Sequence, residues 1–319
     1  MIHWLAELDG RRISVEVPAT SANLGAGYDC LGLALDVTNR IDLEVRSWSR
    51  GEIELAVEGE GANELPADRT NRFVRGLEAA LGAARGEVPP GAGWRIAMTN
   101  RIPLERGLGS SAAATVAGVV AGNALAGERL TTSDMLRLAA EIEGHPDNVS
   151  AALMGGFVVS APTETGVEAI RFDVPRDLRA VLFIPELRFR TSAMRAVLPS
   201  RVPFADAVAN LGRVAIGVAG LATGRHELLR LLTQDRLHER YRAAAYPQLP
   251  RLLGAAREAG AIGACLSGAG STVIAFADGV GTLTRVEAAV AAVAAEHDLP
   301  GQLVIVSPRN EGARVTARG

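Results

Sequence analysis

Apolar and polar residues alternate in several stretches of the first half of the chain. A period of two residues is typical of half-buried strands, because successive side chains point to opposite faces of a sheet. The clearest stretches are residues 12–18, 41–46, 52–57 and 94–98. They predict one mainly antiparallel sheet, and the chain is expected to return to it over residues 153–160.

Helical spacing of apolar residues occurs in both halves. In the first half it predicts helices over residues 70–81 and 133–143, the second capped by Thr131 or Thr132. In the second half the expected order is strand, three helices, two strands around residues 266–272, helix and strand. The segments are residues 180–184, 204–222, 226–233, 249–259, 283–296 and 302–306. The order predicts helices on one face of a small antiparallel sheet. We therefore expect two α+β domains, residues 1–165 and 166–319.

Residues 108–127 contain no charged side chain. Their length would suit a membrane span, but alanine and glycine make the stretch weakly hydrophobic, and no aromatic or basic belt flanks it. A core helix after a tight turn is a second alternative. We prefer a glycine-rich loop over residues 107–111 that opens a buried helix, because the free N–H groups and the dipole of a first turn attract a phosphate.

Composition narrows the class of protein. Among the 319 residues 48% are apolar and 22% are charged, with a net charge of −3, as in a folded globular protein. No basic block suggests nucleic acid, and the first residues lack the continuous apolar core of an export signal. Cys30 and Cys265 are too far apart for a metal or redox motif. We expect a cytoplasmic protein without a nucleic-acid or membrane partner.

The chain contains no lysine, so all 33 of its basic Lys/Arg residues are arginine. This excludes a P-loop lysine, a Schiff base and a lysine base. If the protein transfers a phosphoryl group, then backbone amides, Mg²⁺ and arginine must carry the positive charge.

Three loops occur in a recognisable order: PATSANLGAGYD at residues 18–29, PLERGLGSSAA at 103–113 and LSGAGST at 266–272. Their order and chemistry resemble the three motifs of the GHMP small-molecule kinases. Within that superfamily, TSANLG followed by GYD, and EGHPDN at 143–148, are similar to homoserine kinases. The resemblance covers residues 13–307. It implies an α+β fold, with an N-terminal domain like ribosomal protein S5 domain 2 and a ferredoxin-like C-terminal domain.

The resemblance also implies ATP and Mg²⁺ as cofactors. It places the nucleotide against Asn71, near the adenine, and against loop residues Pro103, Leu104, Glu105, Arg106, Gly107, Leu108, Gly109, Ser110, Ser111, Ala112, Ala113, Ser267 and Gly268. For the metal it implies Ser111 with Glu141, and Glu143 is a rival for the carboxylate. Expected catalytic residues are Ser110, Ser111, Glu141, Asn148 and Arg195.

The implied substrate is L-homoserine, phosphorylated for threonine biosynthesis. The matching positions are Asn23, Asp29, Asn148, Thr191, Arg195 and Arg242. Independently, a substrate with a fixed ammonium and a fixed carboxylate needs one anion and one or two guanidinium groups, and Asp29, Arg195 and Arg242 provide that set.

The mechanism and some alternatives stay open at the level of sequence. Asp147 is a candidate base, but we favour direct attack of the substrate hydroxyl on the γ-phosphate, with catalysis by positioning and charge stabilisation. Alternative functions are a GHMP kinase for another small alcohol, such as a mevalonate-type acid, and a non-catalytic sensor. A homodimer is also open.

Overall fold

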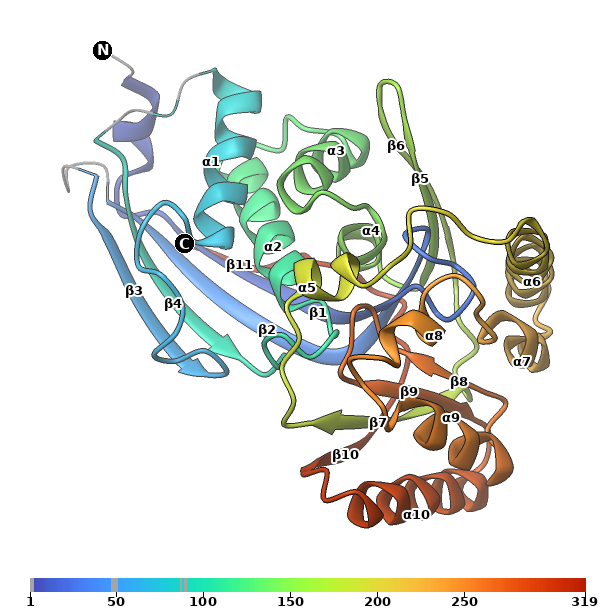
Figure 1. The fold of residues 1–319 in the computed structure, drawn as a ribbon. Coiled ribbons are helices and arrows are strands. Elements are labelled where there is room, and N and C mark those ends of the chain that lie inside the picture. Colours follow the sequence, from blue (N-terminus) through green and yellow to red (C-terminus); the bar gives the residue numbers. More distant parts are fainter. Residues whose placement is uncertain (1–2, 47–50, 87, 89–90) are drawn as a thin grey trace.

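The computed structural model describes residues 3–46, 51–86, 88 and 91–319. It contains two sheets, each packed against its own helices, and these two units lie side by side (Figure 1). The first unit is built around a seven-stranded sheet of order β11-β1-β2-β4-β3, in which β5 also pairs with β2 and β6 pairs with β5. Its strands are β1 (Arg12–Ala22), β2 (Leu31–Arg46), β3 (Ile53–Gly59), β4 (Gly93–Asn100), β5 (Phe157–Thr163), β6 (Gly166–Phe172) and β11 (Arg314–Arg318). Only β3 and β4 pair in parallel, so the prediction of a mainly antiparallel sheet is confirmed.

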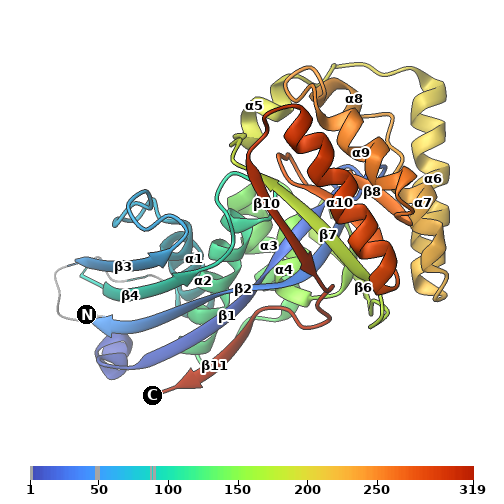
Figure 2. The same cartoon turned by 90° about the horizontal axis from the view of Figure 1, so that it is seen from below.

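The first sheet extends further along the chain than the sequence predicted. β5 and β6 form an antiparallel hairpin whose turn joins Thr163 to Gly166, so the boundary expected near residue 165 falls inside the hairpin. In addition, β11 returns from the C-terminus to pair with β1 (Figure 2). The first sheet therefore reaches residue 172 and includes strand β11 near the C-terminus.

Four helices cover one face of this sheet, and a short 3₁₀ helix, η1 (His3–Leu8), precedes β1. They are α1 (Arg72–Arg85), α2 (Ser110–Leu125), α3 (Thr132–Glu143) and α4 (Asp147–Met154). The predictions of α1 and α3 are confirmed, and Thr131 caps α3 in a capping box with Asp134. Helix α4 was not predicted, and the strand expected from residue 153 begins at Phe157.

Helix α2 is uncharged because the fold buries it on most sides. Apart from its first turn, it packs between α1 and the sheet. A side chain on Gly118 would come within 2.0 Å of the Phe73 carbonyl oxygen, and one on Gly76 within 2.3 Å of the Thr115 carbonyl oxygen. The two helices thus approach backbone to backbone. A helix that is apolar all round is expected in such a position.

The second unit is a four-stranded antiparallel sheet of order β10-β7-β9-β8 with helices on one face. Its strands are β7 (Arg179–Pro185), β8 (Gly263–Leu266), β9 (Val273–Ala277) and β10 (Gly301–Val306). Helices α9 (Leu249–Glu258) and α10 (Val280–Glu296) pack on that face. The other helices of this part of the chain are α5 (Thr191–Ala196), α6 (Phe204–Ala222), η2 (His226–Leu228), α7 (Leu229–Leu232) and α8 (Glu239–Arg242). This order of elements and strands is the predicted ferredoxin-like arrangement.

Helix α6 stands at the edge of the molecule (Figures 1 and 2). Among the described helices it alone is long and apolar enough to cross a membrane by length and composition, and 28% of that apolar window is buried in the fold. Phe204 is 85% exposed and Leu211 is 71% exposed, on the side that faces away from the body.

Candidate active site

A cavity of about 670 Å³ brings all three sequence loops together. Most predicted site residues line it, namely Asn23, Asp29, Pro103, Glu105, Arg106, Gly107, Leu108, Gly109, Ser110, Ser111, Ala112, Asn148, Thr191, Arg195, Arg242 and Gly268. The first and second loops come from the first domain, and the third joins β8 to β9 in the second. The site therefore depends on the packing of both domains.

The glycines of the second loop allow close backbone packing. Gly109 precedes α2 with φ +70°, and a side chain there would come within 2.0 Å of Thr20 Oγ1. A side chain on Gly107 would come within 2.1 Å of the Ser267 carbonyl oxygen. Ser267 Oγ donates to the Gly107 carbonyl oxygen at 2.7 Å, so a hydrogen bond holds the third loop against the second. This packing fixes the loop that opens α2.

The first turn of α2 presents backbone donors to the cavity. The amides of Ser110, Ser111 and Ala112 have no helical carbonyl one turn earlier, and the first intrahelical bond runs from the Ala113 N–H to the Gly109 carbonyl. Because the positive end of the helix dipole lies at the same place, an anion is stabilised there.

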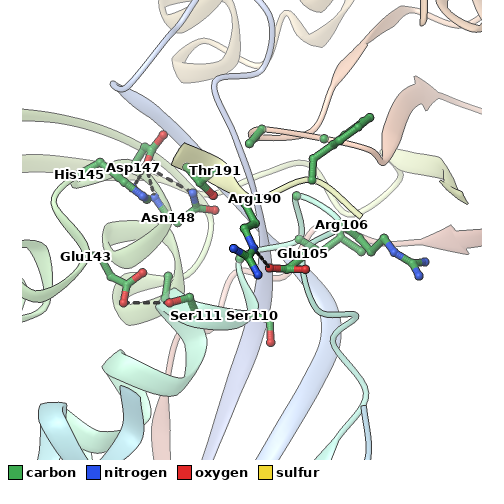
Figure 3. Close-up of a pocket in the computed structure, with 18 of the residues that line it drawn as sticks. Glu105, Arg106, Ser110, Ser111, Glu143, His145, Asp147, Asn148, Arg190 and Thr191 are labelled. Atoms are coloured by element: carbon green, nitrogen blue, oxygen red, sulfur yellow. Dashed lines mark hydrogen bonds and ion pairs between the residues drawn. The ribbon is translucent and has the colours of Figure 1, made fainter. Parts of the chain in front are cut away.

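A buried carboxylate lies beside this turn, and it belongs to Glu143. Its Oε1 accepts a hydrogen bond from Ser111 Oγ at 3.0 Å (Figure 3). It also accepts from Thr115 Oγ1 at 2.7 Å, and Arg72 NH1 lies 3.5 Å away. Glu141 was the preferred sequence candidate, but its side chain is 59% exposed and pairs with Arg137. Glu141 therefore lies away from the first turn of α2, because two residues along a helix turn the side chain to the other side.

The start of α4 forms a second polar cluster in the cavity. Asp147 Oδ1 accepts from the Asn148 N–H at 2.7 Å and lies 2.9 Å from His145 Nδ1 (Figure 3). Asn148 Oδ1 accepts from Thr20 Oγ1 at 2.8 Å. Burial alone would lower the pKa of His145, but the hydrogen bond and the charge of Asp147 raise it overall. Asp147 thus holds both of its neighbours in place.

Asp29 and Arg195 pair with each other. Arg195 NH2 donates to Asp29 Oδ1 at 2.6 Å and NH1 to Oδ2 at 2.8 Å, and this bidentate hydrogen bonding raises the pKa of Arg195. The Asp29 N–H donates to the side-chain oxygen Oδ1 of Asn23. The side-chain nitrogen Nδ2 of Asn23 in turn donates to the Gly268 carbonyl. Asn23 and Asp29 both have positive φ, a strained conformation that concentrates at functional sites.

Arg242 is buried and held by three partners. Its Nε donates to the Met194 carbonyl, and NH1 contacts both the Gly268 carbonyl and His238 Nδ1. Burial lowers the pKa of His238 to about 4, so the ring is neutral and its Nε2–H donates to the Gly25 carbonyl. His238 was not singled out in the sequence, because no motif marks it.

Several expected residues do not line the cavity. Asn71 caps α1, with Oδ1 accepting from the Phe73 N–H and Nδ2 donating to the Pro66 carbonyl, so its amide is occupied away from the site. At that turn Arg72 lines the cavity instead. Leu104, Ala113, Ser267 and Glu141 are also absent from the lining. Glu143, the rival metal carboxylate, and Asp147, the candidate base, do line it. His145, Phe189 and Arg190 also line it, although the sequence analysis assigned them no contact there.

Comparison with known proteins agrees with the three-loop site. The model of the GHMP kinases N terminal domain matches residues 71–156, and that of the GHMP kinases C terminal matches residues 218–297. A homoserine kinase of Caldicellulosiruptor saccharolyticus is 40% identical, covering 95% of this chain and 96% of its own. The chain belongs to the homoserine kinases. The homoserine kinase of Moorella thermoacetica is also 40% identical, covering 94% of this chain and 99% of its own.

Solved structures agree with this homoserine kinase fold. The homoserine kinase of Cytophaga hutchinsonii matches with a TM-score of 0.83 at 29% identity, covering 95% of this chain and 97% of its own. Mevalonate kinase of L. major, solved with R-mevalonate, matches with a TM-score of 0.66 at 16% identity, covering 92% of this chain and 95% of its own. The second likeness shows the shared fold alone. The two-domain GHMP kinase fold expected from the sequence is thereby confirmed.

Proposed function

We propose that this chain transfers the γ-phosphoryl group of ATP to the side-chain hydroxyl of L-homoserine, the step that yields O-phospho-L-homoserine for threonine biosynthesis. The observation that carries the proposal is the joining of two recognition sets in one cavity. Backbone amides at the start of α2 suit phosphates, and Asp29, Arg195 and Arg242 suit an amino acid. The homoserine kinase relatives support the same substrate.

Mg²⁺ fits the residues beside the first turn of α2. Ser111 Oγ and the Glu143 carboxylate are oxygen ligands within 3.0 Å of each other, and Mg²⁺ in kinases takes one or two such ligands together with substrate phosphates. When bound there, the ion would neutralise charge on the phosphates. Ser111 and Glu143 would hold it, and Arg72 would balance the carboxylate from the other side.

The remaining residues position the substrates. Asp29 would receive the ammonium of homoserine, Arg195 and Arg242 its carboxylate and reacting end, and Asn148 its hydroxyl. Asp147 is already bonded to His145 and Asn148, which favours a positioning role over that of a base. In the transfer, the hydroxyl oxygen bonds to the γ-phosphorus while the bond to the β-bridging oxygen breaks. ADP keeps that electron pair, and the hydroxyl proton passes to the transferred phosphoryl group.

Release of ADP with a panel of acceptors tests the substrate. L-homoserine should stimulate ADP formation well above the rate without acceptor, whereas mevalonate should not. Phosphorus NMR identifies the product as a phosphate monoester. Turnover of mevalonate but not of homoserine would reject the proposal in favour of the alternative alcohol kinase, and binding of ATP without turnover of either would favour the sensor.

The outer face of α6 supports a homodimer. Its large exposed residues are Phe204, Val208, Leu211 and Ile216, and its second half also exposes the small residues Ala215, Ala219 and Ala222. A two-fold axis across the middle of an antiparallel helix pair would place Leu211 beside the partner subunit's Ile216, and Phe204 beside the partner subunit's Ala222. A self-complementary surface of this kind is typical of two-fold assemblies.

Sedimentation equilibrium tests this assembly. Leu211→Glu should convert a dimer to a monomer, whereas Ile305→Glu, at an exposed apolar site on β10, should not change the mass. A monomeric wild-type chain, or one whose α6 binds lipid vesicles, would contradict the homodimer.

We further propose a cytoplasmic location. Both cysteines are free thiols, and Cys265 is buried in the second domain, which is consistent with a reducing compartment. Fractionation of cells that express the tagged chain would test it, and recovery with membranes or outside the cell would contradict it.

A further inference from the structure

Arg190 differs from the other cationic residues around the cavity. The arginines that line it are Arg72, Arg106, Arg190, Arg195 and Arg242. Since the chain has no lysine, any positive side chain that meets the transferred phosphoryl group must come from this set or from His145.

Four of these guanidinium groups are held by protein partners. Arg195 is bidentate with Asp29, and buried Arg242 is bound to Met194, Gly268 and His238. Arg72 donates to the Ile142 carbonyl beside Glu143. Arg106 donates to the Pro185 carbonyl at 2.6 Å, and Figure 3 shows its guanidinium turned away from Ser110.

Arg190 is held only loosely. Its side chain is 82% exposed, and within the described part of the chain its one ion-pair partner is Glu105, with 3.7 Å between Nε and Oε1. Figure 3 shows the side chain extending from beside Thr191 toward Glu105 and the loop that carries Ser110. The backbone beneath it is fixed, because the Phe189 N–H donates to the Glu105 carbonyl at 3.0 Å. An exposed guanidinium on a hydrogen-bonded backbone therefore lines the cavity beside the phosphate loop.

Glu105 gives a physical reason for this arrangement. Its carboxylate lies in the phosphate loop, where it would repel a triphosphate, and Arg190, 3.7 Å away, partly balances its charge. A more highly charged phosphoryl group would compete for the same guanidinium, because planar N–H pairs suit phosphate oxygens.

We propose that Arg190 is a further catalytic residue, which leaves Glu105 and donates hydrogen bonds to the phosphoryl group as it passes from ATP to the acceptor. The inference rests on the proposed function. Charge on the phosphoryl oxygens is then stabilised by the fork of Arg190 together with the amides of the α2 turn.

The test compares Arg190→Ala with Arg188→Ala. Arg188 is two residues away, lies outside the cavity and forms an ion pair with Glu64. Arg190→Ala should lower kcat at least about a hundredfold while the Kd for ADP and the thermal midpoint stay near wild type. Arg190→Lys should fall between, because it keeps the charge and loses the fork. Arg188→Ala should stay within about twofold of wild type on the same measurements.

A second background separates a role on the phosphate from mere neutralisation of Glu105. If Arg190 acts on the phosphoryl group, Arg190→Ala should reduce kcat by a similar factor whether position 105 is Glu or Gln. Loss of that factor in the Glu105→Gln background would overturn the proposal, and so would a wild-type kcat in Arg190→Ala. Wild-type protein that does not phosphorylate homoserine would instead reject the proposed function itself.

Discussion

Ser111 and Glu143 meet across 3.0 Å at the first turn of α2, although 32 residues separate them in the chain. The contact joins the phosphate loop to the end of α3. Glu143 also accepts from Thr115, one turn further along α2, so its carboxylate is fixed from two sides. This carboxylate is the one that the metal proposal needs.

Separate substitution of Glu143 and of Glu141 by glutamine tests that proposal. Glu143→Gln should lower kcat roughly 100-fold and remove the dependence of the residual rate on Mg²⁺ concentration, because an amide is a poor Mg²⁺ ligand. Glu141→Gln should stay near wild type, since its exposed side chain contacts only Arg137 among the described residues. Initial rates over a Mg²⁺ titration decide the matter. A larger effect of Glu141→Gln than of Glu143→Gln would instead identify Glu141 as the metal ligand.

The phosphate loop is tested by two glycines at opposite ends of α2. Gly109 and Gly127 have φ values of +70° and +84°, so the backbone strain alone should cost alanine about 1 kcal/mol of stability at either position. Only at Gly109 would the new Cβ press on site residues, Thr20 and Asn148. Gly109→Ala should therefore weaken ATP binding about tenfold or more in calorimetry, and Gly127→Ala should not. Equal affinities would contradict the phosphate loop.

The sequence identified the loop at the start of α2 because its chemistry is local. Glycine positions, adjacent serines and the uncharged run that follows all lie within about one helix, and each has a physical reason that a pattern reveals. The strands of the first sheet were predictable for the same reason, since their alternation is continuous along the chain.

Contacts between distant segments were not predictable in the same way. Glu141 and Glu143 differ by roughly 200° around α3, and only the packing of α3 on α2 decides which one faces Ser111. Strand β11 is short and mostly polar, and its partner lies some 300 residues earlier, so no periodic pattern marks it. His238 supports Arg242 from inside the core, where a lone histidine in the sequence gives no signal.

A buried carboxyl in α8 predicts a pH-dependent stability. Burial raises the pKa of Glu239 to about 8, although the Leu266 N–H donates to Oε1 at 2.7 Å. Between the ordinary pKa of about 4.3 and this value, the folded protein holds a proton that the unfolded chain has lost. The free energy of unfolding should therefore fall as pH rises from 5 to 8, by up to about 1.4 kcal/mol per pH unit from this group.

Glu239→Gln isolates this effect, because glutamine keeps an acceptor oxygen and does not titrate. Urea unfolding at pH 5.5 and pH 8 should show a smaller loss of stability in this variant than in wild type. Glu258→Gln, at an exposed position at the end of α9, should follow the wild-type profile. An unchanged slope in Glu239→Gln would mean that the carboxyl is ionised in the folded protein.

The amino-acid end of the cavity gives the sharpest test of substrate class. Asp29 and Arg195 pair with each other, and homoserine offers each of them a new partner of opposite charge. Because their side chains are about one-third exposed, we expect the lower end of the range for a charged pair, about 2 kcal/mol, or about thirtyfold in kcat/KM. Asp29→Asn and Arg195→Lys should both lose that much with homoserine and keep near wild-type affinity for ATP.

An acceptor without the amino group separates recognition from folding. Wild type should prefer homoserine over 4-hydroxybutanoate, because only homoserine carries the ammonium that Asp29 would receive. In Asp29→Asn the ratio of kcat/KM for homoserine to kcat/KM for 4-hydroxybutanoate should fall. The variant loses activity on homoserine, whereas the analogue has no ammonium whose contact with Asp29 could be lost. In Arg195→Lys both acceptors should suffer together, because both keep the carboxylate and the hydroxyl. A variant at position 29 that slows the two acceptors equally would show that Asp29 shapes the loop and does not bind the ammonium.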